Sequence, residues 1–437
     1  MVNYICPNCN REFDQKGHFT KHENRKTPCK KDLRTEQRIQ TAITAALPGL
    51  KFIDLFCGVG GFHQALVKLG AKCVLACDID AKCRDIYNKN YGIMPHDDIT
   101  TLNAETIPDF DILCGGFPCQ PFSNGGNKKS FDDKRGKLFD EIIRIVLEKK
   151  PRFMFLENVK HIKKISNGEV FKYILEELAK ANYEVNVSEI SPHQLGIPQQ
   201  RERIIFTCIR KDIYDSTKDI SINLPKTKKC DFENILEKNP DKKYNISKST
   251  EKILEVWDEM IKHVDVDESL SPVILCKEFQ NNYSQQEFKK LPKWKQEYIT
   301  KNRRIYEKYK DKWNEWFDNH KDTLNLNEVN GKLEWQAGHK VANDSIFNHF
   351  IQLRQSGIRV KKAKFFPTLV AIVQIPIYGK ERRYLTPREC ARLQSFPDTF
   401  ILHPDDKIAY KQFGNAVNVD VVHYVMNKVL KVYEIVS

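Results

Sequence analysis

From Lys51 to Val159, short apolar runs alternate with longer segments whose apolar residues recur every three or four positions. Short apolar runs are typical of buried strands, and the three- to four-residue spacing is typical of amphipathic helices. The pattern predicts strand–helix pairs at 51–56 and 63–70, at 73–80 and 81–92, and at 110–116 and 138–150, with a further strand at 152–159.

Strands that alternate with helices form βαβ units, which build a mainly parallel sheet. Because such crossovers are right-handed, the carboxyl ends of the strands lie along one edge, where open α/β sheets bind ligands. We therefore expect an α/β, Rossmann-like domain whose loops after residues 56, 80, 117 and 159 meet at one cleft.

The alternation ends after Arg210, and a region rich in Lys, Asn and Asp continues to about residue 382. We expect a smaller, irregular domain here. Within it, aromatic and apolar residues at three- and four-residue steps predict one face of a long charged helix, and we favour a packed face over a platform for stacking bases. The stripe consists of Trp294, Tyr298, Ile305, Tyr309, Trp313 and Trp316. The segment 386–396 is helical in pattern, and the apolar spacing of 413–436 predicts a helix that rejoins the α/β core.

The first 34 residues have cysteine and histidine at metal-site intervals, C-x2-C-x12-H-x6-C, formed by Cys6, Cys9, His22 and Cys29. A unit this small cannot fold on burial alone, so these four residues predict a structural zinc site. The pattern resembles a C2H2 zinc finger as far as His22 and then departs from it, which leaves His18 as an alternative ligand. We expect a finger over residues 1–34 and a linker over 35–50. Added DNA affinity from the basic residues of the finger is a hypothesis; they are Lys16, Lys21, Arg25 and Lys26.

The charge balance changes the picture of the partner. The 71 Lys and Arg outweigh the 58 Asp and Glu, a formal net charge of +13 that favours a polyanion. No apolar run approaches the roughly 20 residues of a membrane span, and the amino terminus has no apolar signal core. Thirteen cysteines without such a signal are expected to be reduced thiols. We expect a cytoplasmic protein, nucleoid-associated, or a nuclear one in a eukaryote.

Two segments at the predicted cleft combine into a nucleotide-type pocket. The loop DLFCGVGGF carries Gly58, Gly60 and Gly61 between a strand and a helix, where backbone can approach a ligand closely. Asp78, twenty residues after Gly58, ends the next strand and can accept hydrogen bonds from ribose hydroxyls. The two features together predict a nucleoside-containing cofactor.

Reactive groups follow other strands of the same sheet. Cys119 lies between Pro118 and Pro121 just after a strand and can serve as a nucleophile. Glu157 places a carboxyl group at the same edge, and Arg201 and Arg203 alternate as the chain enters a strand, hence on one face of it. The remaining cysteines near this region are expected to be small apolar core residues; they are Cys57, Cys73, Cys77, Cys83 and Cys114.

The order of nine blocks resembles the motif series of the cytosine-5 DNA methyltransferases, and it covers residues 51–210 and 366–425. The blocks are DLFCGVGGF, ACDID, DDIT, GGFPCQPFS, RGKLF, ENV, PQQRERIIF, LTPRECARLQSFPD and FGNAV. The resemblance implies the S-adenosylmethionine-dependent methyltransferase fold over 51–210, a target-recognition domain over 211–382, a helical block over 383–412 that bridges the domains, and a returning helix over 413–437.

The resemblance also assigns roles by position. Cys119 would attack the base, Glu157 would engage N3 and the amino group of cytosine, and Arg201 and Arg203 would support them. The S-adenosylmethionine pocket would comprise Phe56, Gly58, Gly60, Asp78, Asp98, Ile99, Leu138 and Asn415. The partner would be double-stranded DNA, bound by a monomer, with a separate restriction endonuclease as a functional counterpart.

Thiolate addition at carbon 6 makes carbon 5 of cytosine nucleophilic enough to take a methyl group, and the base must leave the duplex to be reached. One rival interpretation is a transfer-RNA cytosine-5 methyltransferase of the same family. The long variable region, the finger and the lack of a Cys-Phe-Thr tripeptide argue against it. A second rival is an inactive DNA-binding regulator, against which the intact catalytic set argues.

Overall fold

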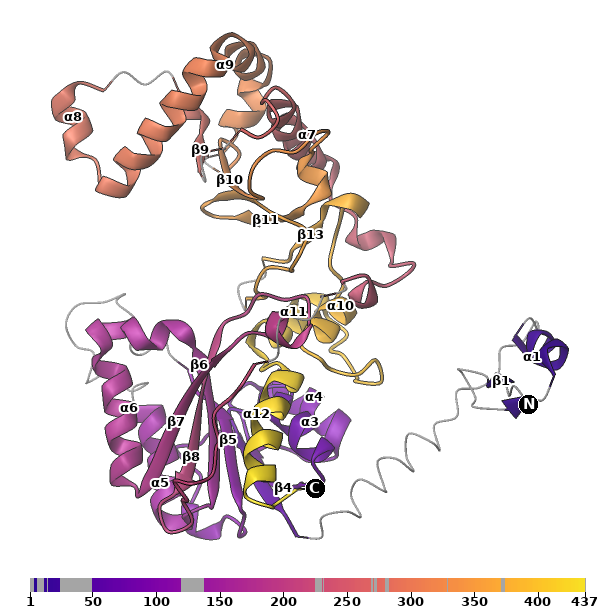
Figure 1. The fold of residues 1–437 in the computed structure, drawn as a ribbon, viewed down its shortest axis with the longest axis vertical. Coiled ribbons are helices and arrows are strands. Elements are labelled where there is room, and N and C mark those ends of the chain that lie inside the picture. Colours follow the sequence, from indigo (N-terminus) through magenta and orange to yellow (C-terminus); the bar gives the residue numbers. More distant parts are fainter. Residues whose placement is uncertain are drawn as a thin grey trace.

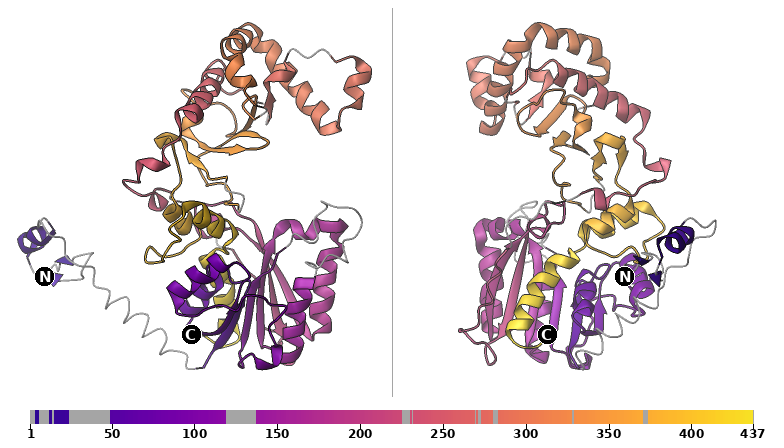
Figure 2. Two further views of the ribbon diagram at one scale, coloured as in Figure 1. Left: turned by 180° about the vertical axis from the view of Figure 1, so that it is seen from behind. Right: turned by 45° about the vertical axis from the view of Figure 1, so that its right-hand side comes forward.

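The computed structural model describes residues 4–5, 12–13, 15–23, 49–118, 137–224, 230, 232–268, 270, 273–279, 283–327, 329–370 and 374–436. Two lobes are visible, a larger one built on a sheet of long strands and a smaller one above it (Figure 1). The chain passes from the larger lobe to the smaller lobe and back. The carboxyl-terminal helix therefore lies in the larger lobe, beside the helix that begins at Gly61 (Figures 1 and 2).

The larger lobe contains a six-stranded sheet in the order β4-β3-β5-β6-β8-β7. The neighbours from β4 to β6 are parallel, and β8 is antiparallel to both β6 and β7. The predicted α/β fold is confirmed, with a mixed rather than purely parallel sheet. The strands are β3 (Lys51–Leu55), β4 (Lys72–Cys77), β5 (Ile112–Gly116), β6 (Phe153–Val159), β7 (Tyr183–Ile190) and β8 (Arg203–Arg210).

Helices cover both faces of this sheet because successive strand residues point to opposite sides. Phe52 and Phe153 belong to the apolar cluster under α3, α4 and α12, whereas Ile53 and Met154 belong to the cluster under α5 and α6. The helices are α3 (Gly61–Lys68), α4 (Ala81–Tyr91), α5 (Lys137–Lys149), α6 (Glu169–Lys180) and α12 (Val419–Val432). The first cluster also takes in α10 (Pro387–Leu393) and α11 (Asp406–Asn415).

The smaller lobe is more regular than its sequence suggested. It holds a second six-stranded sheet in the order β14-β13-β11-β12-β10-β9, with α7 (Lys248–Lys262) and α9 (Lys293–Asn325) packed on one face. Strands of two to five residues are too short to show alternation in sequence. They are β9 (Ile274–Leu275), β10 (Lys332–Gln336), β11 (Phe350–Arg354), β12 (Gly357–Lys361), β13 (Ile377–Tyr378) and β14 (Arg383–Tyr384), and a short helix, α8 (Gln285–Lys290), precedes α9.

The aromatic stripe of α9 is a packed face for most of its length. Ile305, Tyr309, Trp313 and Trp316 are buried in the core of the smaller lobe, as predicted. Tyr298 is only half-buried, and Trp294, at the start of the helix, has 57% of its surface exposed. Among the described residues, no helix is long and apolar enough to cross a membrane.

The amino-terminal segment contains two short antiparallel strands, β1 (Tyr4–Ile5) and β2 (Glu12–Phe13), followed by α1 (Lys16–Glu23). Of the four predicted zinc ligands, only His22 is among the described residues, and its side chain is buried. Cys6, Cys9 and Cys29 lie outside the described residues. Over the described ranges, no group of three or more His, Cys, Asp or Glu is placed to hold a metal ion.

Candidate active site

The glycine loop after β3 is held against the end of β4 by one carboxylate. Oδ2 of Asp78 accepts the amide N–H of Gly58 at 2.7 Å, and Oδ1 accepts that of Asp80 at 2.8 Å. Phe56, Gly58 and Gly60 all have a positive φ, between 53° and 87°. The turn therefore depends on left-handed backbone, which glycine adopts without strain.

Space for a ligand exists above this loop. A Cβ built on Gly58 would meet no atom within 4 Å, so its backbone is open to an approaching molecule. On the other side the loop is packed tightly, because a Cβ on Gly61 would lie 2.5 Å from the carbonyl oxygen of Val417. Asn415, exposed at the end of α11, precedes that contact by two residues. Burial raises the pKa of Asp78, opposed by the two amide hydrogen bonds.

Asp98 and Ile99 lie in the turn that follows α4. Oδ1 of Asp98 accepts a hydrogen bond from the amide N–H of Thr100 at 2.9 Å and another from the hydroxyl of Thr100 at 2.8 Å. These bonds lower the pKa of Asp98. Ile99 is buried, and its carbonyl oxygen accepts Nη2 of Arg144 in α5 at 3.0 Å. Leu138, near the start of α5, is half-buried against the same core cluster.

An apolar residue at this edge was missed by sequence reasoning. Ile79, directly after Asp78, has 77% of its surface exposed, the highest value, shared with Leu326, among the large apolar residues that the structure describes. An isoleucine between two aspartates at the end of a strand was the available signal. An exposed apolar surface of this kind can pack against the flat face of a planar ring.

Glu157 and Arg203 form the central ion pair of the site. Nε of Arg203 lies 2.8 Å from Oε1 of Glu157, and the two side chains are only 15% and 12% exposed. The antiparallel pairing of β6 and β8 aligns Glu157 with Ile205, two residues from Arg203. The other carboxylate oxygen, Oε2, would lie 3.5 Å from a Cβ on Gly116, the last residue of β5.

The last described residues before Cys119 lie at this point. Gly116 pairs with Glu157 across the sheet, and Nδ2 of Asn158 donates to the carbonyl oxygen of Phe117 at 3.0 Å. Cys119 follows Gly116 by three residues and lies outside the described residues.

Arg201 has different surroundings from Arg203. Its Nη1 donates to the carbonyl oxygen of Leu369 at 2.7 Å, and its Nη2 donates to those of Gly414 and Ala416, each at 3.0 Å. The residue is 2% exposed. The structure thus brings Arg203 to the carboxyl group and uses Arg201 to join three segments that are distant in sequence.

The cysteines expected to fill the core do so. Cys57, Cys73, Cys77, Cys83 and Cys114 are all buried. Burial is the largest cause that raises the pKa of each thiol, so none of these five is a ready thiolate.

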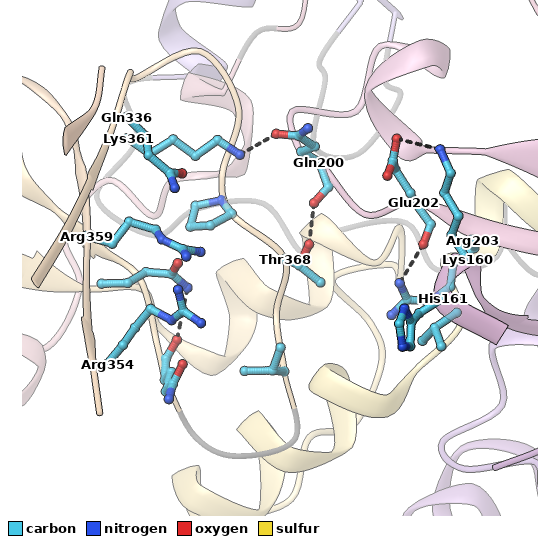
Figure 3. Close-up of a pocket in the computed structure, with 15 residues that line it drawn as sticks. Lys160, His161, Gln200, Glu202, Arg203, Gln336, Arg354, Arg359, Lys361 and Thr368 are labelled. Atoms are coloured by element: carbon cyan, nitrogen blue, oxygen red, sulfur yellow. Dashed lines mark hydrogen bonds and ion pairs between the residues drawn. The ribbon is translucent and has the colours of Figure 1, made fainter. Parts of the chain in front are cut away.

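A cavity of about 470 Å³ lies between the two lobes, and Arg203, the partner of Glu157, is among the residues that line it (Figure 3). The larger lobe contributes Lys160, His161, Gln200 and Arg203, and the smaller lobe contributes side chains of β10, β11 and β12. Lys361 of β12 donates a hydrogen bond to Oε1 of Gln200 across the cavity, and Thr368 donates to the backbone carbonyl of Gln200 at 2.6 Å (Figure 3). The side chains that line the cavity are rich in Lys and Arg, in keeping with the positive net charge of the chain.

Comparison with known proteins identifies a family model and relatives that match most of this chain. The family model described as C-5 cytosine-specific DNA methylase matches residues 50–431. The chain is similar to Type II methyltransferase M.HhaI of Haemophilus parahaemolyticus, with 32% identity over 87% of this chain and 94% of that protein. It is also similar to Type II methyltransferase M1.ScrFI of Lactococcus lactis subsp. cremoris, with 33% identity over 88% of this chain and 79% of that protein.

Solved structures share the fold at lower identity. The Entamoeba histolytica methyltransferase EhMeth superposes with a TM-score of 0.52 at 19% identity, covering 87% of this chain and 98% of its own. A putative DNA modification methyltransferase from an Escherichia coli prophage gives 0.52 at 22% identity, covering 88% and 100%. Since the family model spans most of the chain and the relatives exceed 30% identity over nearly all of it, the chain belongs to the C-5 cytosine-specific DNA methylases.

Proposed function

We propose that this enzyme methylates carbon 5 of a flipped-out cytosine within a specific duplex DNA sequence, with Cys119 as the nucleophile. The observation that carries the proposal is the buried Glu157–Arg203 pair beside Gly116, where the Cys119 loop begins. A carboxyl group fixed by a guanidinium in a largely buried position is suited to engage N3 of a base.

S-adenosylmethionine would bind at the carboxyl ends of β3 and β4. Its ribose hydroxyls would find Asp78, its adenine would lie against Ile79 with Asp98 and Ile99 at its edge, and the remainder would lie along the glycine loop that holds Phe56, Gly58 and Gly60, where the backbone of Gly58 is open. Leu138 and Asn415 would complete the site. When bound, S-adenosylmethionine supplies an electrophilic methyl group for carbon 5.

The residues of this chain would make carbon 5 reactive. The thiolate of Cys119 forms a bond to carbon 6, and Glu157 hydrogen-bonds or protonates N3 as electron density moves toward carbon 5. After methylation, a base, which we take to be a water molecule, removes the carbon-5 proton, and the bond between Cys119 and carbon 6 breaks. Arg203 keeps Oε1 of Glu157 occupied, so that Oε2 faces the base, and Arg201 acts as a positioning residue.

Duplex DNA would bind between the lobes against the cationic side chains that line the cavity, and the smaller lobe would read its sequence. The relatives named as Type II methyltransferases favour a role in a restriction–modification system, with a separate endonuclease as counterpart. We further propose that residues 1–34 form a small zinc finger held by Cys6, Cys9, His22 and Cys29. Its support is the ligand spacing and the strand–strand–helix order of β1, β2 and α1, with His22 buried on the helix.

The experiment is methyl transfer from tritiated S-adenosylmethionine to duplex DNA and to transfer RNA, with the native chain and Cys119→Ser. Label on DNA that depends on Cys119 is expected. Label on transfer RNA alone would support the related RNA enzyme, and no label on either would support an inactive regulator. Covalent capture on DNA that contains 5-fluorocytosine should also require Cys119.

A further inference from the structure

The sheet of the smaller lobe presents one polar face to the cavity. In β10, β11 and β12, the residues that point away from the cavity are buried apolar side chains such as Trp335, Ile351 and Val360. Five of the residues that alternate with them line the cavity, and all five are cationic or amide side chains. They are Gln336 of β10, Gln352 and Arg354 of β11, and Arg359 and Lys361 of β12 (Figure 3).

Glu334 of β10, a 7% exposed carboxylate, contacts both of these arginines. Its Oε2 accepts Nε of Arg359 at 2.7 Å and Nη1 of Arg354 at 3.3 Å, and its Oε1 accepts the hydroxyl of Ser356 at 2.9 Å. The register of the sheet explains the contact, because Glu334 pairs directly with Arg359 in the parallel ladder. Both guanidinium groups are therefore held by one fixed anion.

This bonding leaves each arginine a free pair of donors. Arg359 uses Nε, and within the described residues Nη1 and Nη2 have no hydrogen-bond partner. Arg354 uses Nη1, which leaves Nε and Nη2. Two parallel N–H donors match O6 and N7 of guanine in the major groove, which is the commonest specific contact between proteins and DNA.

A base edge explains these features better than a phosphate does. The two arginine side chains are recessed, with 29% and 27% exposure, whereas a backbone contact needs only an exposed cation. Glu334 would also repel a phosphate, but it stabilises an arginine that faces the neutral acceptors of guanine. The same cavity is lined by Arg203, the partner of Glu157, so a duplex that delivers cytosine to Glu157 passes this face.

We propose that Arg354 and Arg359, positioned by Glu334, read guanines of the target sequence in the major groove. This inference rests on the proposed function and adds part of the base specificity to it. The recognition sequence should then contain at least one fixed guanine, on either strand, besides the base paired with the target cytosine.

The test is methylation of a random-sequence duplex library whose strands are joined by a hairpin, so that bisulfite sequencing recovers both strands of each molecule. The full-length native chain is compared with Arg359→Gln, Arg354→Gln and Arg359→Lys. Arg304→Gln is the control, because it removes an exposed charge of α9 that does not line the cavity. Thermal unfolding of each variant checks that it is folded.

We expect each Gln variant to lose preference for guanine at one position by roughly tenfold to one-hundredfold, with the other positions unchanged. Arg359→Lys keeps the charge but lacks the paired donors, so it should lose the same preference, and Arg304→Gln should retain the native profile. Glu334→Gln should weaken both guanine positions.

Three results would overturn the inference alone: a native profile without such a guanine, a uniform loss of rate over all sequences, or full guanine preference in Arg359→Lys. A native chain that methylates no member of the library would reject the proposed function and this inference with it.

Discussion

Arg203 and Glu157 lie on antiparallel neighbours, β8 and β6, and their side chains meet at 2.8 Å in a largely buried position. A buried carboxylate with a single guanidinium partner has one oxygen fixed and one left to act. The pair therefore determines which carboxylate oxygen can reach a base and in which orientation.

Replacing Glu157 with Gln removes the acid but keeps the shape of the side chain. We expect kcat to fall by about 10² to 10⁴, the usual contribution of general acid–base catalysis, with little change in DNA affinity. Steady-state methyl transfer and a separate DNA-binding assay check this. Glu189→Gln is the matched control and should keep native kcat, because Glu189 lies on β7, on the far side of β8 from β6, and its carboxylate pairs with surface lysines. Equal rates for the two variants would contradict the role of Glu157.

Replacing Arg203 with Lys keeps the charge but loses the Nε contact that fixes Oε1. We expect kcat to fall by roughly tenfold or more, because the carboxyl group can then rotate away from the productive geometry. A crystal structure of the variant should show Glu157 in more than one rotamer. A native rate with a displaced Glu157 would show that its orientation does not matter.

Replacing Arg201 with Met should act on stability. Three buried carbonyl oxygens, those of Leu369, Gly414 and Ala416, would lose their donor. We expect a loss of about 3 kcal/mol or more in the free energy of unfolding, measured by urea denaturation. Arg210→Met, near the surface at the other end of β8, should cost about 1 kcal/mol or less. A similar small loss for Arg201→Met would remove the case for a positioning role.

Much of the larger lobe could be predicted from sequence because its first strands are long and alternate with helices along the chain. Apolar runs of six to eight residues identified β3, β4, β5 and β6, and parallel pairing then placed Asp78 and Glu157 at one edge, whereas β7 was not predicted. The comparison of Arg201 with Arg203 shows the limit of that reasoning. Alternation placed them on one face, but β8 begins at Arg203, so the position two residues earlier does not follow the geometry of the strand.

The smaller lobe could not be predicted because its order comes from long-range contacts. Its two-residue strands, such as β9 and β13, carry no periodic signal, and the β10–β12 pairing joins segments that only the folded sheet brings together. The role of Glu334 depends wholly on that pairing. Nothing in the sequence near Glu334 indicates that it holds Arg354 and Arg359.

The stability of the larger lobe should depend on pH through His63. Burial lowers the pKa of His63 from 6.5 to about 3, while its Nδ1 lies 2.7 Å from the hydroxyl of Tyr87. Because the unfolded chain binds the proton more readily, stability is lost as pH falls from about 6.5 toward 3. Between pH 7 and pH 5 this group should account for about 2 kcal/mol. Denaturation of the native chain and His63→Gln at both pH values checks this, and an identical pH dependence would exclude the contribution of His63.

The zinc proposal predicts about one zinc ion per native chain. Cys6→Ser or Cys9→Ser should abolish it, because a small finger that loses one thiolate loses both the metal and its fold. Cys230→Ser is the control, because Cys230 is a half-buried cysteine outside the proposed finger of residues 1–34. Metal content is measured by mass spectrometry of the purified full-length proteins.

If the finger adds DNA affinity, deletion of residues 1–34 should weaken binding most at low salt, where phosphate contacts contribute most, while kcat on saturating DNA stays native. Unchanged affinity after deletion would leave a zinc site without a role in DNA binding, and unchanged zinc content in both serine variants would reject the site itself.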